Sequence, residues 1–226
     1  MTDPQIHPTA IVEDGAVIGP GCKIGPYCIV GPNVRLGEEV ELRAHVVLDG
    51  HTVIGNNTRI FPFASIGLPP QDLKYAGEPT KLSIGPRNVI REYVTINPGT
   101  EHGGGETVIG NDNLIMIGAH IAHDCQIGSH IVMANNATLA GHVVVGDYVW
   151  FGGLSAVHQF VRIGTHAVIG GMAGVENDVI PYGRVKGERA HLAGLNIIGL
   201  ERRGFSKERI KVLQRAFNQI FGAEGT

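Results

Sequence analysis

Residues 109–133 read IGNDNL IMIGAH IAHDCQ IGSHIV M when the chain is divided every six residues. Each group opens on isoleucine, and Met133 keeps the phase. Stepping by six from Ile6 reaches only Ile, Val or Leu as far as Ile66, and stepping on from Ile109 reaches apolar residues as far as Val175. A period of six fits neither an α-helix nor an alternating strand, whose periods are about 3.6 and 2. It is typical of a parallel β-helix.

The repeat predicts an all-β solenoid over residues 1–190. Three hexapeptides would close one triangular coil of about 18 residues, and each coil would pair with the next about 4.8 Å away. The aliphatic residue points inward, and the glycine that often follows it, as at Gly110 and Gly128, relieves crowding at the bend. Since no coil buries its own face, stability comes from stacking. The hexapeptide class usually winds left-handed, so we expect a left-handed parallel β-helix.

Two segments interrupt the repeat, at residues 67–83 and 97–108. The phase continues through the first, but its inward positions would be Asp72 and Glu78. Because a core does not accept two unpaired carboxylates, we expect a loop that leaves the coil there. The second segment is rich in glycine and is also expected to be a loop. Such loops either carry function or are tolerated insertions.

A helical tail is predicted over residues 191–226. Ser206 can cap a helix, and apolar residues then recur at helical spacing at Ile210, Leu213, Phe217 and Ile220. Residues 201–215 hold six basic and two acidic side chains. This bias fits either a solvated helix face or an acidic partner.

Composition narrows the class of protein. Apolar residues make up 43% of the 226, which is enough for a large core, and the net charge of −3 argues against a general nucleic-acid binder. No apolar run approaches the roughly 20 residues of a membrane span, and the first residues do not resemble a signal peptide. The three cysteines match no zinc-site spacing. We expect a cytoplasmic protein with free thiols.

Histidines from three distant motifs are predicted to share one patch. Residues 18 apart lie over one another on adjacent coils, so His123, Gly141 and Gln159 form one column. Asp124, His142 and Phe160 form the column beside it, and His120 lies one bend away. Histidine suits general-base work near neutral pH, and a glycine leaves a backbone N–H accessible to an oxyanion.

Two other interpretations of this patch remain open at this point. His120, His123 and His142 could bind zinc, as three histidines do in some hexapeptide-repeat proteins that hydrate carbon dioxide. The histidines could also be surface residues that are tolerated at bends. Cys125 is a weak candidate nucleophile, because it precedes the core residue Ile127 and is expected to lie partly inward.

Five stretches resemble the family of acyl-[acyl-carrier-protein]–UDP-N-acetylglucosamine O-acyltransferases, which begin lipid A synthesis. They are QDLKYAGEPT (71–80), AHIAHDC (119–125), ANNATLAGHV (134–143), AVHQF (156–160) and LERRGFS (200–206). The resemblance covers nearly the whole chain. It implies a homotrimer with active sites between subunits, acyl carrier protein and a UDP-sugar as partners, and no cofactor or metal.

The resemblance also implies roles for single residues. His123 would be the general base, and the N–H of Gly141 would stabilise the oxyanion. Gly171 would limit acyl length and, being glycine, would leave room for a longer chain. Residues implied to contact the sugar nucleotide or acyl group are Asp72, Lys74, His120, His142, Gln159, Asn196, Arg202 and Arg203.

Some features depart from the family pattern. Asn97 stands where relatives often carry histidine, and Ile198 replaces an acidic residue, so the acceptor could also be a 3-amino UDP-sugar. Family members continue for a few dozen residues beyond the position of Thr226, so the helical segment is expected to be shorter than the family norm. A sister N-acyltransferase carries a uridine-binding domain before its repeats; here the repeats begin at Ile6.

Overall fold

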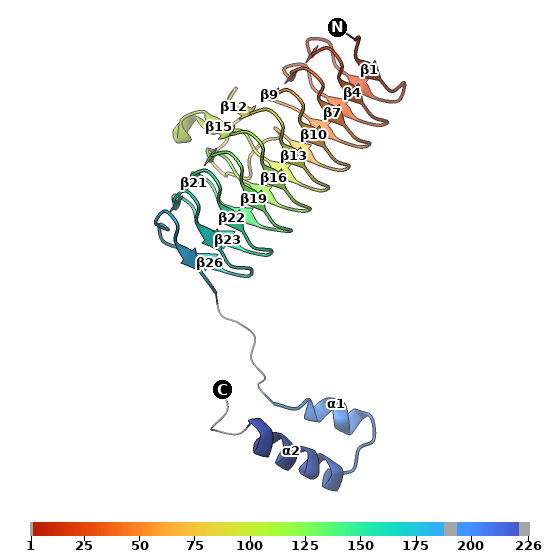
Figure 1. Ribbon diagram of the computed structural model, residues 1–226. Coiled ribbons are helices and arrows are strands. Elements are labelled where there is room, and N and C mark those ends of the chain that lie inside the picture. Colours follow the sequence, from red (N-terminus) through yellow and green to blue (C-terminus); the bar gives the residue numbers. More distant parts are fainter. Residues whose placement is uncertain (1, 188–193, 222–226) are drawn as a thin grey trace. The chain divides into compact units, whose positions relative to one another are not determined.

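The computed structural model describes residues 2–187 and 194–221. The chain divides into two compact units, residues 1–188 and 189–226, and each is described by itself. The first unit is a left-handed parallel β-helix, as the repeat predicts. Its coils stack in chain order (Figure 1). No helix within the described ranges is long and apolar enough to cross a membrane.

Three parallel sheets form the faces of the solenoid, and nearly all strands have two residues. Sheet A contains β1 (Gln5–Ile6), β4 (Lys23–Ile24), β7 (Glu41–Leu42), β10 (Arg59–Ile60), β13 (Val89–Ile90), β16 (Leu114–Ile115), β19 (Val132–Met133), β22 (Trp150–Phe151), β25 (Val168–Ile169) and β27 (Arg184–Val185). Sheet B contains β2 (Ile11–Val12), β5 (Ile29–Val30), β8 (Val47–Leu48), β11 (Ser65–Ile66), β14 (Thr95–Ile96), β17 (His120–Ile121), β20 (Thr138–Leu139), β23 (Ala156–Val157) and β26 (Gly174–Val175). Sheet C contains β3 (Val17–Ile18), β6 (Arg35–Leu36), β9 (His51–Ile54), β12 (Lys81–Ile84), β15 (Glu106–Ile109), β18 (Gln126–Ile127), β21 (Val144–Val145) and β24 (Arg162–Ile163).

The register of the strands gives the predicted coil of 18 residues. Ile6 pairs with Ile24, and Leu139 pairs with Val157. The aliphatic residues that the six-residue step selects from Ile24 to Val175 are at most 6% exposed. Only the first coil differs, because no coil covers it: Ile6 is 44% exposed. The periodic residues therefore form one continuous core.

A second inward position lies two residues before each of these aliphatic residues. It holds small or medium side chains, and all three cysteines occupy it, fully buried and unpaired. Cys125 is thus wholly inward, and burial raises the pKa of its thiol to about 12. A thiol in this state is a poor nucleophile, which removes Cys125 as a catalytic candidate.

Most bends contain one residue in the left-handed backbone region. These residues are mostly not glycine, and their φ lies between 53° and 67°, as at Tyr27 and His142. We name the bends after the sheets they join: the A–B, B–C and C–A corners. Side chains in the left-handed slot project outward, so a column of such residues runs up each corner.

The two interruptions of the repeat both lie at the B–C corner. The chain leaves the coil after Ile66 and returns at Lys81, so that Ile54 pairs with Ile84. It leaves again after Ile96, forms a short 3₁₀ turn, η1 (Glu101–Gly103), and returns at Glu106, so that Ile84 pairs with Ile109. The coils on either side keep their register.

The second unit contains α1 (Ile197–Arg202) and α2 (Lys207–Phe221). Ser206 caps α2 as predicted, since its Oγ accepts a hydrogen bond of 3.3 Å from the Arg209 N–H. Ile210 is buried, whereas Leu213 and Ile220 are exposed. The predicted helical segment also contains α1, a short helix whose separate bounds were not predicted and which is capped by the Asn196 side chain.

Candidate active site at the B–C corner

The predicted stack of three motifs is present at the B–C corner. His123 follows β17, Gly141 follows β20 and Gln159 follows β23, and these strands are in register. The His142 N–H donates to the His123 carbonyl at 3.0 Å, and the Phe160 N–H donates to the Gly141 carbonyl at 3.1 Å. Three segments that are far apart in the sequence therefore form one surface.

The His123 ring lies directly against the backbone of Gly141. A Cβ added at Gly141 would stand 2.5 Å from the ring Cε1 and 2.7 Å from Nε2. Such distances are far below van der Waals contact, so this position requires glycine. The Gly141 N–H donates no backbone hydrogen bond within the described residues. It is thus available to a negatively charged oxygen near the imidazole.

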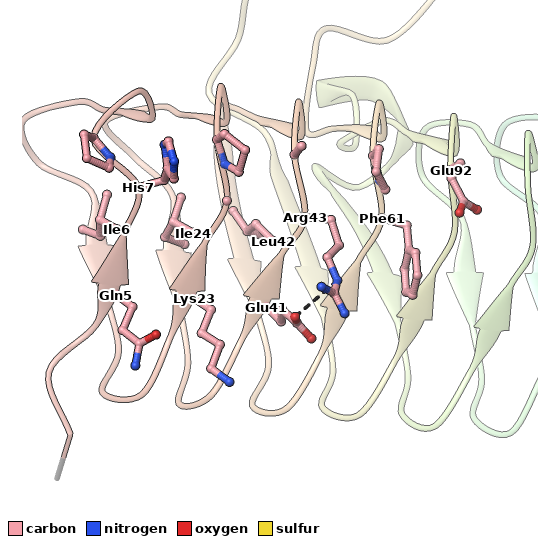
Figure 2. A pocket seen from close by; sticks show the side chains of 15 residues that line it. Gln5, Ile6, His7, Lys23, Ile24, Glu41, Leu42, Arg43, Phe61 and Glu92 are labelled. Carbon is pink, nitrogen blue, oxygen red and sulfur yellow. Dashed lines mark ion pairs between the residues drawn. The ribbon is translucent and has the colours of Figure 1, made fainter.

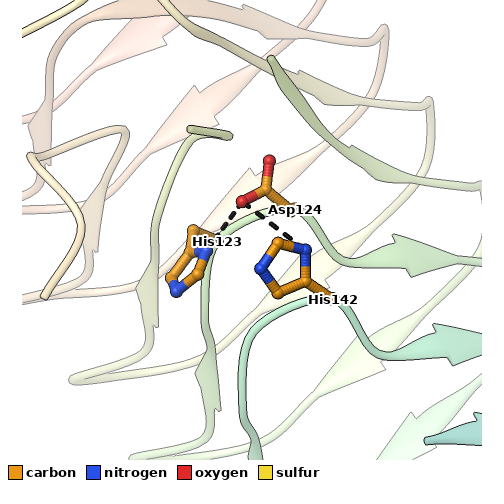
Figure 3. A group of neighbouring side chains, drawn as sticks. All are labelled: His123, Asp124 and His142. Carbon is orange, nitrogen blue, oxygen red and sulfur yellow. Dashed lines mark hydrogen bonds and ion pairs between the residues drawn. The ribbon is translucent and has the colours of Figure 1, made fainter. Parts of the chain in front are cut away.

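Asp124 orients the His123 ring (Figure 3). The ring Nδ1 lies 2.7 Å from Asp124 Oδ2, and the Asp124 side chain is fully buried whereas that of His123 is 15% exposed. Because a carboxylate can only accept hydrogen bonds, the proton lies on Nδ1. The second nitrogen, Nε2, is then a free acceptor, which is the state a general base needs.

The loop of residues 97–108 supplies the donors that keep this carboxylate buried. The Thr100 N–H donates to Asp124 Oδ1 at 2.8 Å, and the Thr100 hydroxyl donates to Oδ2 at 2.7 Å. The Thr107 hydroxyl accepts from the Asp124 N–H at 2.8 Å. Gly103 packs so closely that any Cβ there would overlap the carboxylate. The loop therefore encloses Asp124.

Two further histidines flank His123 and are held in the uncharged form. Burial, and then the nearby His123, lowers the pKa of His120, whose Nδ1 lies 2.7 Å from Thr95 Oγ1. Burial also lowers the pKa of His142, against an opposing effect of Asp124 and Asp72. The His142 ring meets the His123 ring edge to face at 5.0 Å. Neutral imidazoles here avoid adding positive charge beside the base.

The other predicted contact residues fall into separate groups. Asp72 lies in the loop of residues 67–80 and acts electrostatically on His142, so it belongs to the patch. Lys74 is exposed in the same loop, and its N–H donates to Asp72 Oδ1. Gln159 is exposed beside Gly141. Gly171 lies at the A–B corner, at the other edge of sheet B, where an added Cβ would meet only the Gly153 backbone.

Three predicted residues belong to the second unit. Asn196 caps α1 through its side-chain oxygen, which accepts from the Gly199 N–H at 2.8 Å. Arg202 ends α1, and Arg203 follows it. Both guanidinium groups are exposed and lie next to each other in the chain. A pair of arginines in this state suits a diphosphate.

The three-histidine zinc interpretation is wrong as it was predicted. Among the described residues, the group that could hold a metal ion consists of His123, Asp124 and His142, and it excludes His120. Two of its ligand atoms, His123 Nδ1 and Asp124 Oδ2, are already 2.7 Å apart in a hydrogen bond. The arrangement matches an imidazole oriented by a carboxylate.

The roles of Asp124, Thr100 and Thr107 were not predicted from the sequence. Asp124 was placed in a neighbouring column, but its contact with His123 was not inferred. The adjacency of the two residues in AHIAHDC was the available signal. Nothing in the glycine-rich segment NPGTEHGGGETV indicated that its threonines return to this carboxylate.

A groove lies elsewhere on the described structure. It has a volume of about 860 Å³ and lies over the N-terminal coils, where His7 and Arg43 are among its lining residues (Figure 2). Lys23, Glu41 and Phe61 also line it, and an ion pair joins Glu41 to Arg43 at 3.2 Å. It shares no residue with the histidine patch.

Comparison with known proteins identifies the family. Bacterial transferase hexapeptide repeats match residues 15–50 and 106–141, and the second domain of UDP N-acetylglucosamine O-acyltransferase matches residues 178–226. The solved LpxA structure of Acinetobacter baumannii is 47% identical, with a TM-score of 0.80, and the match covers 98% of this chain and 86% of that one. The chain belongs to the UDP-N-acetylglucosamine O-acyltransferase family.

Two further members of this family support the assignment. The UDP-N-acetylglucosamine acyltransferase of Francisella novicida is 44% identical, with a TM-score of 0.81, over 95% of this chain and 79% of that one. The acyl-[acyl-carrier-protein]–UDP-N-acetylglucosamine O-acyltransferase of Paracoccus denitrificans is 60% identical over 161 residues. That match covers 71% of this chain and 62% of the relative's length, so the chain spans about three fifths of this curated relative.

Proposed function

We propose that the protein transfers a 3-hydroxyacyl chain from acyl carrier protein to the glucosamine 3-position of UDP-N-acetylglucosamine. This would be the first step of lipid A synthesis. The observation that carries the proposal is the stack of His123 on Gly141 with Asp124 behind the ring. It occurs in a chain that is 60% identical to a relative named for this reaction.

The geometry assigns a role to each of these residues. Nε2 of His123 removes the proton from the 3-hydroxyl as that oxygen attacks the thioester carbonyl carbon. The carbonyl oxygen becomes negative, and the Gly141 N–H donates to it. When the tetrahedral intermediate collapses, the C–S bond breaks and the His123 imidazolium returns its proton to the leaving thiolate. Asp124 holds the ring and stabilises the imidazolium between the two proton transfers.

We assign the substrate contacts to the remaining residues of the patch and of the second unit. Asp72, Lys74, His120, His142 and Gln159 would contact the sugar nucleotide or the acyl group. Asn196, Arg202 and Arg203 would bind the nucleotide diphosphate. We further propose a cytoplasmic homotrimer, in which the acidic surface of acyl carrier protein meets the basic second unit. No nucleic acid, metal or cofactor takes part.

Gly171 would set the acyl length. Its added Cβ would meet only the Gly153 backbone, with the carbonyl oxygen at 3.3 Å and the nitrogen at 3.8 Å. The proposal therefore favours a longer chain than a bulky residue would allow. Gly171→Met should shift the preferred acyl carrier protein toward shorter chains, and an unchanged length profile would contradict this role.

A substrate matrix tests the function. The full chain is assayed with 3-hydroxyacyl carrier proteins of several lengths, against UDP-N-acetylglucosamine and against its 3-amino analogue. Product with the first acceptor supports O-acyl transfer. Product with the analogue alone would change the acceptor but keep the reaction class. Absence of product with both would disprove the proposed function.

A further inference from the structure

The loop of residues 97–108 meets the histidine patch at one buried side chain, Asp124. Thr100 contributes both its N–H and its hydroxyl to that carboxylate and is itself 2% exposed. Its neighbours Glu101 and His102 are exposed. The loop therefore acts on the site through Thr100 more than through its charged residues.

We propose that Thr100 is a positioning residue, whose hydroxyl fixes the Asp124 carboxylate so that Asp124 in turn orients the His123 base. This inference rests on the proposed function, since it assigns His123 the role of base. Oδ2 of Asp124 receives two donors, the Thr100 hydroxyl at 2.7 Å and His123 Nδ1 at 2.7 Å. One donor lies on the loop and the other on the coil, and together they fix the position of this oxygen.

The hydroxyl has two effects on the carboxylate. It limits rotation of the Asp124 side chain. Gly103, which has no Cβ, leaves space for this side chain but does not hold it in place. The hydroxyl also stabilises the negative charge of Oδ2 by donating a hydrogen bond. Without this donor, the charge of Oδ2 would act wholly on the His123 ring. The other titratable groups around Asp124 and the imidazoles are His142, with Nδ1 3.9 Å from Oδ2, and His120 and Asp72 farther out.

Substitution of Thr100 by valine and serine separates the hydroxyl from the shape of the side chain. Thr100→Val keeps the branched shape and the backbone N–H but removes the hydroxyl, whereas Thr100→Ser keeps the hydroxyl. Thr58→Val is the matched control, because Thr58 is also fully buried and its hydroxyl bonds only backbone groups, including the Gly85 carbonyl at 3.2 Å. All variants are assayed as the full chain for kcat, KM and the pH profile of kcat/KM, and for thermal unfolding.

A positioning role predicts a specific pattern. Thr100→Val should lower kcat about tenfold with KM changed less than twofold, the effect of one hydrogen bond to a charged group. The acid limb of kcat/KM should move to higher pH, because an unshared carboxylate holds the imidazolium more strongly. Thr100→Ser should restore both, and Thr58→Val should change neither.

The contrary results are equally defined. If Thr100→Val matches Thr58→Val in kcat and in the acid limb, the inference is wrong even when the wild-type protein transfers acyl groups. If Thr100→Ser fails as Thr100→Val does and both lose thermal stability equally, Thr100 is a structural residue only. Failure of the proposed function itself would appear differently, as a wild-type protein that forms no product.

Discussion

The A–B and B–C corners place side chains in the same left-handed backbone slot, yet they contain different chemistry. At the A–B corner, Tyr27, His45, Phe63 and Tyr93 stack with ring centroids 5.0 to 5.1 Å apart and nearly parallel planes. At the B–C corner the same slot holds Asp124, His142 and Phe160. The backbone is equivalent, with φ near 60° in both columns. His142 and Phe160 stack as the A–B rings do, with centroids 4.4 Å apart, so the difference lies at Asp124 and arises from the adjacent loop.

A buried carboxylate can occupy the slot only where donors surround it, whereas an exposed one such as Glu39 needs none. Asp124 is 5% exposed, and an unpaired buried charge would be strongly destabilising. The loop of residues 97–108 provides the donors at the B–C corner, whereas the A–B corner has no insertion and stacks flat rings instead. A regular corner therefore gives a stacked ladder, whereas a loop inserted in one coil can supply donors to a buried carboxylate on the next coil.

The largest expected effect comes from removing the base. His123→Ala should lower kcat for acyl transfer about 100- to 10,000-fold, the usual contribution of a general base. The matched control is His45→Ala, which removes a histidine from the A–B ladder and should leave kcat within about twofold. Steady-state kinetics on the two variants would measure the contrast. A loss of less than about tenfold in His123→Ala would contradict the assignment.

The next effect comes from filling the space beneath the ring. Gly141→Ala places a Cβ 2.5 Å from His123 Cε1, so the imidazole must move, and kcat should fall about 10- to 1000-fold. Gly174→Ala is the control, because its Cβ would meet nothing within 4 Å. Equal kcat values for the two variants would show that the stack is not needed for activity.

A change in the ladder should affect stability and not activity. Phe63→Ala removes the ring that stacks on both His45 and Tyr93, each contact being worth about 0.5–1.5 kcal/mol. The midpoint of thermal unfolding should fall by about 2–6 °C. Calorimetry and an activity assay on the same preparation would test this. A loss of kcat with no loss of stability would contradict the structural role of the A–B ladder.

The smallest effect concerns pH. Burial lowers the pKa of His120 and of His142 below the usual 6.5, so the unfolded chain binds protons at a pH where the folded chain does not. Stability should therefore decrease as the pH falls below about 6.5, down to the lower pKa values that the two histidines have in the folded protein.

Replacing one of these histidines should weaken the pH dependence. His120→Gln should lose less stability than the wild type between about pH 7.5 and 5.5, by about 1–2 °C in the unfolding midpoint. Thr58→Val, which replaces a side chain that does not titrate in this range, should follow the wild-type slope. Identical slopes for wild type and His120→Gln would show that His120 is not held uncharged by the fold.

Sequence periodicity predicted the solenoid because its cause is local and repeated. Every sixth residue packs against equivalent residues of the adjacent coils. Ile109 and Ile127 therefore occupy the same kind of environment, and the pattern repeats along the chain. The same arithmetic placed His123 over Gly141. It could not show that Thr100 reaches Asp124, because a loop has no period and its path depends on contacts that occur once. Nor could it distinguish His120 from His142 as a possible metal ligand, since that depends on ring orientation.

The unchanged register on either side of the two loops has an evolutionary consequence. Because Ile54 still pairs with Ile84 and Ile84 with Ile109, a segment can be inserted at a corner without altering the coils that flank it. The entropic penalty of a longer segment rises only by about 0.6 kcal/mol for each doubling of its length. The solenoid can thus acquire new specificity by trial insertions at one corner, while the remaining corners preserve the scaffold through every trial.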